Sequence, residues 1–332
     1  MSVTAAVAEG LRRVARARVL VAGMWLVNIA VTLPFALVLR DALSEHLGDS
    51  LAADAAVNGA NFDWWNEFLA QASGLGQTFV PSILGFAGVL KNVGSVADGG
   101  ALPGAIALIV AANTLLSMFL LGGVLDRLAR DRSIGAHGFF AASGVFFFRF
   151  LRLGAVALIV YGALFGTLHP WLFDDLYSEW TRNLSVERSA FAIRVALYVA
   201  FGALVAAVNV VFDYAKIRMV VEDRRSAFGA LSAALRFIRR HRGSTIALYL
   251  VNTLLFALVA FIYFIVAPGA GGGGAAVWLG FALGQAYIVA RIVVRLTFAA
   301  SQTALFQSRL AHAGYVARPV PRWPDAPTAE AL

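Results

Sequence analysis

Long apolar blocks separated by charged segments dominate the sequence. Six blocks stand out, at about residues 19–39, 103–125, 152–172, 190–212, 246–267 and 277–299. A helix of about 21 residues, rising 1.5 Å per residue, reaches about 30 Å, which is the thickness of the hydrocarbon core of a bilayer. The pattern therefore predicts an all-α polytopic membrane protein with about six transmembrane helices.

Composition agrees with this prediction. The 332 residues are 60% hydrophobic and 14% charged, whereas soluble domains carry about 25% charged residues. The chain has no cysteine, which excludes disulfides, thiolate metal sites and cysteine nucleophiles. Its five histidines are scattered without the spacing of a zinc site, and no catalytic motif is present. We expect no metal, no cofactor and no enzymatic activity.

The charges between the blocks predict an orientation. Arginine is concentrated in the N-terminal arm and after the second and fourth blocks, whereas acidic residues follow the first and third. Basic segments stay on the cytoplasmic side. The first block exceeds the apolar region of a signal peptide and lacks a nearby cleavage site, so we expect a retained anchor. We predict a bacterial inner-membrane protein with both termini in the cytoplasm, and attribute the net charge of +8 to topology, not to nucleic acid.

An internal repeat is visible in the sequence. Residues 11–28 align without gaps on residues 235–252, and residues 149–152 align on residues 236–239. The repeated unit is a basic helix followed by a transmembrane hairpin, and three such units would run parallel because each contains two spans. The predicted segments are a cytoplasmic basic amphipathic arm (1–18), a first hairpin (19–125) with a long outer loop (41–102), a second repeat (126–213), a third repeat (214–310) and a disordered, proline-containing cytoplasmic tail (311–332).

The third unit begins with an amphipathic pattern. Apolar residues recur at helical spacing on one face, and basic residues lie on another. The pattern predicts an interfacial helix on the cytoplasmic surface. The apolar face comprises Phe228, Leu231, Leu235 and Ile238.

The segment from Asp213 to Arg225 is rich in charges of both signs. Helical spacing places Asp213 near Lys216, Arg218 near Glu222, and Glu222 near Arg225. One interpretation is a site for a phosphate headgroup or an anionic substrate, and the other is a salt-bridge cluster that fixes the helix and the topology. The candidate residues are Asp213, Lys216, Arg218, Glu222, Arg225, Arg236, Arg239 and Arg240.

Polar residues also occur within the apolar blocks. Their amides need hydrogen-bond partners inside the membrane and typically hold helices together. Arg291 and Arg295 lie one turn apart in the last block, so they share a face and must share partners. Pairs such as Gly162 and Gly166 would permit close helix approach. The polar residues are Asn28, Asn113, Asn209, Asn252, Gln285, Arg291 and Arg295.

The first outer loop contains an aromatic segment with Trp64, Trp65 and Phe68, followed by the apolar run 79–90. Twelve residues are too few to span the membrane as a helix, so the loop predicts helices that lie on the outer leaflet. A groove for lipid or peptide is the alternative interpretation.

The stretch from Asp213 to Arg225, continued by residues 228–242, resembles uncharacterised bacterial polytopic membrane proteins similar to the membrane domain attached to some glycerophosphodiester phosphodiesterases. The resemblance implies a helical membrane fold over the six spans, without the phosphodiesterase catalytic domain or its residues. We expect a non-enzymatic protein that binds membrane lipids, including anionic lipids, or a protein partner. The alternative hypothesis is a transporter of a small molecule or lipid, and the third is a membrane enzyme. The sequence does not determine the oligomeric state.

Overall fold

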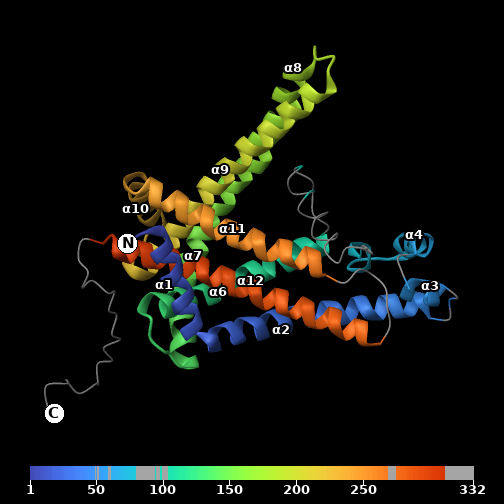
Figure 1. Ribbon diagram of the computed structural model, residues 1–332, viewed down its shortest axis with the longest axis horizontal. Coiled ribbons are helices and arrows are strands. Elements are labelled where there is room, and N and C mark those ends of the chain that lie inside the picture. Colours follow the sequence, from blue (N-terminus) through green and yellow to red (C-terminus); the bar gives the residue numbers. More distant parts are fainter. Residues whose placement is uncertain are drawn as a thin grey trace.

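The computed structural model describes residues 1–48, 50, 52–58, 61–79, 94, 98, 104–267 and 274–310. These residues form helices and no strand (Figure 1). The helices are α1 (Val3–Arg16), α2 (Arg18–Leu47), α3 (Ala52–Asn58), α4 (Phe62–Gln71), η1 (Gly76–Thr78), α6 (Gly104–Arg130), α7 (Ala136–Ala163), η2 (Leu164–Leu168), η3 (Trp171–Leu176), α8 (Tyr177–Thr181), α9 (Glu187–Val221), α10 (Ala227–Arg240), α11 (Arg242–Val266) and α12 (Ala275–Ser308).

Six helical stretches are long and apolar enough to cross a membrane. They are Arg18–Leu47, Ala107–Arg130, Ala136–Thr181, Glu187–Val221, Arg242–Val266 and Ala275–Ser308. The prediction of a helical, multi-pass membrane protein is confirmed to this extent. The predicted third span, 152–172, is shorter than the helical stretch found, because the apolar residues 139–151 extend it.

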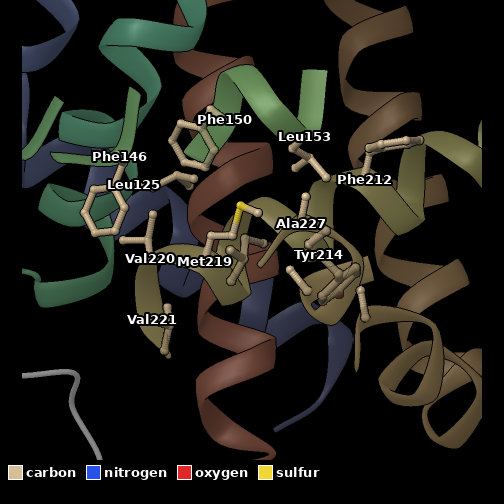
Figure 2. Close-up of a cluster of buried hydrophobic side chains, with 14 of the residues drawn as sticks. Leu125, Phe146, Phe150, Leu153, Phe212, Tyr214, Met219, Val220, Val221 and Ala227 are labelled. Atoms are coloured by element: carbon tan, nitrogen blue, oxygen red, sulfur yellow. The ribbon is translucent and has the colours of Figure 1, made fainter. Parts of the chain in front are cut away.

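The buried core is concentrated at one end of the molecule, which we call the hub. The hub comprises α1, α10, the first half of α7 and the last turns of α6, α9 and α12 (Figure 1). Its largest apolar cluster brings together Leu125 of α6, Phe146 and Phe150 of α7, and Met219 of α9 (Figure 2). Burial of these side chains holds the spans together at the hub.

The helices of the hub pack in a regular order: α1 on α12, α7 on α6, and α10 on α9. Small residues make two of these contacts very close. A Cβ atom on Gly10 would lie 2.9 Å from the backbone nitrogen of Ser301, and one on Gly123 would lie 2.6 Å from the ring of Phe139. The alanine-rich face of α10 provides the third contact.

Local sequence explains where the hub helices begin and end. The hydroxyl of Ser2 accepts the amide N–H of Ala5, and that of Ser226 accepts the N–H of Gly229, so a serine caps both α1 and α10. A single non-helical residue, Ala17, then separates α1 from α2, and His241 separates α10 from α11. Each hub helix can therefore lie at an angle to the span that follows it.

The spans diverge after leaving the hub. The hairpin formed by α7, η2, η3, α8 and α9 points in a different direction from α2, α6, α11 and α12 (Figure 1). No residue of α2 is buried. Far from the hub, Phe173 and Phe201 form a small separate core with His169 within the hairpin. Most apolar faces of the spans are therefore left open to a surrounding apolar solvent.

Candidate functional site: the charged hub

Two of the three charge pairs expected between Asp213 and Arg225 are present. Lys216 Nζ lies 3.0 Å from Asp213 Oδ1, and Arg218 binds both carboxylate oxygens of Glu222, at 3.0 and 2.6 Å. The expected pairing of Glu222 with Arg225 is wrong, because α9 ends at Val221 and the helical spacing ends with it. Arg224 pairs with Glu222 in its place.

Arg218 connects three helices of the hub. Besides binding Glu222, its guanidinium donates to the carbonyl oxygen of Ala233 on α10, at 2.5 Å, and lies 5.2 Å from the ring centre of Phe306 on α12. The side chains of Arg218 and Glu222 are both 14% exposed. Because the donors of Arg218 are used inside the protein, this part of the cluster fixes the helix junction and offers little to a ligand.

The same contacts set the ionisation of Glu222. Burial acts to raise the pKa of this carboxyl, but the hydrogen bonds and charges of Arg218 and Arg224 outweigh it, so the pKa is lowered from its ordinary value of 4.5. Glu222 is therefore ionised at neutral pH and keeps its bonds to both arginines.

Two ion pairs that the sequence analysis missed connect hub helices to the loops that follow α6 and α9. Arg16 of α1 pairs with Asp131 at 2.6 Å, and Arg149 of α7 pairs with Asp223. Both aspartates have positive φ, +47° and +51°. Aspartate tolerates this conformation better than most residues, but Asp131 and Asp223 are distant in sequence from their partners, so spacing could not reveal the pairs.

Arg13 fixes α1 to the rest of the hub and was also missed. Its guanidinium donates to the carbonyl oxygen of Leu128 at 3.0 Å, to Gln307 Oε1 at 2.9 Å and to Glu9 at 3.1 Å. The amide of Gln307 donates in turn to the carbonyl of Ala129. The N-terminal helix is thereby bonded to the ends of α6 and α12.

The arginines of α10 have a different environment. Arg236, Arg239 and Arg240 are exposed and form no ion pair with the described residues. Phe228 is 72% exposed and Leu235 38% exposed. The helix packs on α9 mainly through alanines, and Leu231, Phe237 and Ile238 are partly buried beside them against the same core. The alanines are Ala227, Ala230, Ala233 and Ala234. Apolar and basic side chains are therefore exposed together on α10.

Three of the amides predicted within the spans hold helices together, as expected. Asn252 donates to Ser301 Oγ at 2.9 Å, Gln285 Oε1 accepts from the indole of Trp25, and Asn209 accepts from Tyr161. The amides connect α11 with α12, α2 with α12, and α7 with α9. Of the other two, Asn28 is half-buried and Asn113 is exposed.

Arg291 and Arg295 lie on α12, outside the hub, and both are exposed. The guanidinium of Arg291 lies 5.5 Å from the ring centre of Tyr287 and 6.0 Å from that of Phe256 on α11. Neither arginine forms an ion pair with a described residue.

The aromatic segment of the predicted outer loop folds onto the far end of α2. Trp64 and Phe68 of α4 are buried, their rings stack, and the Trp64 indole donates to Nδ1 of His46 at 3.0 Å. The indole of Trp65 donates to the carbonyl of Phe79. A helix at this segment is confirmed, but its aromatic side chains are used largely in local packing. The rest of the run 79–90 lies outside the described residues.

Neither a metal site nor similarity to known proteins indicates a function for this chain. Within the part of the chain that the structure describes, no three histidine, aspartate or glutamate side chains are grouped so that they could hold a metal. Comparison of the chain with protein-family models, curated proteins and solved structures gives no match. Function must therefore be inferred from the residues themselves.

Proposed function

We propose that the chain consists of three parallel repeats, each with a hub helix followed by a hairpin of two spans. The order of packing supports this arrangement: α1 lies on α12, α7 on α6 and α10 on α9. Each hub helix thus contacts the second span of the preceding repeat, with the first repeat contacting the last. Such a cyclic order is expected of three equivalent units around an axis along the membrane normal.

Equivalent positions support the same proposal. When the two alignments described above are extended without gaps toward the N-terminus, Ala6, Ser143 and Ala230 coincide, and all three are 0% exposed. Ala17 and His241, the residues that interrupt the helix, also coincide. The second unit departs from this pattern because α7 continues without a break.

The ion pairs add a third correspondence. Arg16 with Asp131, and Arg149 with Asp223, each join the hub helix of a repeat to the loop after its second span. We propose that the hub, where most of the arginines lie, faces the cytoplasm in a bacterial inner membrane, since basic segments resist translocation.

The proposed function of the hub is to bind anionic membrane lipid through α10. The observation that carries it is the exposure of Arg236, Arg239 and Arg240 beside exposed Phe228 and Leu235. Phenylalanine and leucine insert at the boundary of the acyl chains, while arginine binds lipid phosphate, and each basic residue near an anionic surface contributes about 1 kcal/mol. A protein partner is the other ligand class expected from the sequence.

Substitution of these arginines tests the function. The R236Q/R239Q/R240Q variant, in nanodiscs of mixed phosphatidylcholine and phosphatidylglycerol, is expected to retain less phosphatidylglycerol than the wild type when bound lipid is measured by native mass spectrometry. The matched control is R182Q/R188Q/R194Q, which removes three exposed arginines at the far end of the α7–α9 hairpin. Equal retention in both variants would count against the proposal.

Transport of a small molecule or lipid is the second candidate function. It is favoured by Arg291 and Arg295, which lie inside a stretch long and apolar enough to span the membrane. A charged residue inside a span is costly and typically marks a substrate or ion pathway.

A further inference from the structure

Arg291 differs from an arginine that simply reaches for the membrane surface. In a helix the Cα–Cβ bonds tilt toward the N-terminus, and the N-terminus of α12 is the end far from the hub. The guanidinium of Arg291 follows this direction, because it lies over Tyr287, one turn earlier, at 5.5 Å from the ring centre. Its charge is therefore directed toward the middle of the span and away from the hub.

The depth of this charge follows from helix geometry. Tyr287 is nine residues after Trp278, which is 74% exposed near the start of α12, and this separation is about 14 Å along the axis. It is about 21 Å from Ser301, where Gly10 of α1 contacts the helix. In a hydrocarbon core of about 30 Å, the guanidinium of Arg291 lies near mid-depth.

The apolar blocks themselves supply no carboxylate to Arg291. None of the six apolar blocks contains an aspartate or glutamate. The two aromatic rings of Phe256 and Tyr287 offer Arg291 their faces, at 6.0 and 5.5 Å from the ring centres, and Arg295 lies one turn closer to the hub on the same face. Arginine remains charged under all conditions at which proteins fold, so the pair needs an anion from outside the chain.

We propose that Arg291 and Arg295 form a site within the membrane for the phosphate group of an anionic phospholipid, which enters sideways between the spans. Two observations favour a lipid over other occupants. Both arginines are exposed on the side of a span, and the α7–α9 hairpin points away from the α11–α12 pair that carries them (Figure 1). The apolar blocks of a second copy would again contain no acid. This site is separate from the lipid-binding surface proposed on α10, and the proposal does not depend on that surface.

The experiment uses the R236Q/R239Q/R240Q background, so that lipid bound at the hub does not mask the site. Nanodiscs of phosphatidylcholine with a minor fraction of phosphatidylglycerol provide the probe, and native mass spectrometry measures the lipid retained. Adding R291Q/R295Q is expected to weaken phosphatidylglycerol retention about tenfold or more, the effect of losing a charge-assisted contact of about 1.4 kcal/mol. The matched control is R194Q, which removes an exposed arginine that also lies over a tyrosine ring, that of Tyr177.

A structural role for Arg291 would give a different result. If the contacts of Arg291 with the rings stabilise the fold, R291Q/R295Q lowers the melting temperature. R291K/R295K keeps the charge, so it would then restore the melting temperature without restoring the preference for phosphatidylglycerol. Under the proposal, the glutamine variant melts no lower than the background and the lysine variant retains part of the phosphatidylglycerol.

Three outcomes would overturn the proposal. The first is equal phosphatidylglycerol retention with and without R291Q/R295Q. The second is displacement of the bound lipid by millimolar inorganic phosphate, which would indicate a site for a soluble anion. The third is a dimer or a co-purified protein that is lost with the two arginines. Failure of the α10 variant to lose lipid would refute the proposed function alone, since the two sites are changed separately.

Discussion

At the scale of single residues, the close approach of α1 to α12 in the hub depends on a glycine. A Cβ atom at Gly10 would lie 2.9 Å from both the backbone nitrogen and the Cβ of Ser301. The backbone nitrogen of a span cannot move without its helix, so the G10A variant is expected to lose about 1–3 kcal/mol of stability through overpacking. Thermal unfolding in detergent measures the loss, and faster trypsin cleavage within α1 would show that the helix has loosened.

The control for this prediction is Gly23 of α2, where an added Cβ would meet nothing within 4 Å. Alanine is the better helix former by about 1 kcal/mol, so G23A is expected to leave the melting temperature unchanged or raise it. Equal destabilisation by the two substitutions would mean that G10A acts through helix propensity or detergent effects and not through contact with Ser301.

These glycines show why packing could not be predicted from spacing. The sequence pattern pointed to Gly162 and Gly166, but no atom lies within 4 Å of a Cβ built at either residue. Close approaches occur instead at glycines such as Gly10 and Gly123, which lack that spacing, because a glycine permits close packing only where a second helix arrives. The intramembrane amides were easier to predict, since an amide inside an apolar span requires a partner wherever it lies.

At the scale of elements, the junction between α9 and α10 depends on Glu222. Its pKa is lowered by Arg218 and Arg224 against the effect of burial, so the carboxylate contributes stability above the unfolded-state pKa and loses it as the pH falls through the lowered value. The E222Q variant is expected to be less stable by about 1–3 kcal/mol at neutral pH, because Arg218 loses a charged partner. The difference from wild type should shrink as the pH falls below 4.5, the ordinary pKa of glutamate, toward the lowered pKa of Glu222.

Melting temperatures measured from pH 7 to about pH 3.5 test this dependence. The control is E187Q, in the exposed first turn of α9 at the far end of the helix. A constant difference between wild type and E222Q across the range would contradict the ionic role of Glu222 and leave a packing role.

Elements were predicted better than the faces they bury. The pattern from Phe228 to Ile238 correctly indicated a helix, and Ser226 begins it as a cap. Its buried residues are alanines, which are common both on surfaces and in cores and are therefore not distinctive in a hydrophobic pattern. Leu231 and Ile238 of the predicted apolar face are partly buried against the same core, whereas Phe228 and Leu235 are exposed. The pairing of Glu222 with Arg225 failed for a related reason: α9 ends at Val221, and helical spacing has no meaning beyond that residue.

At the scale of the whole molecule, the six apolar helices were predictable because each is long enough to cross a bilayer by itself. The hub and the divergence of the α7–α9 hairpin were not, because they depend on contacts between residues far apart in sequence, such as Arg13 with Leu128. Periodicity describes a helix, but contains no information on the direction in which neighbouring helices leave a common core.

The proposed parallel repeats predict which segments share a side of the membrane. The chain contains no cysteine, so single cysteines can be labelled without background. Cysteines at Ser2 and Ser232, on exposed positions of the hub, should react with a membrane-impermeant maleimide only when the cytoplasmic side is accessible. Cysteines at Ser73 and Ser185, exposed in the outer ends of the first two hairpins, should react from the opposite side.

Labelling of intact spheroplasts and of inverted vesicles compares the two sides directly. If Ser73 and Ser185 variants react from opposite sides, the first two hairpins run in opposite senses and the proposed threefold order is wrong. If all four variants follow the expected sides, the long α7–α9 hairpin crosses in the same sense as α2 and α6 despite its different direction. The arginines of the hub would then lie together at the leaflet where anionic lipid headgroups can reach α10.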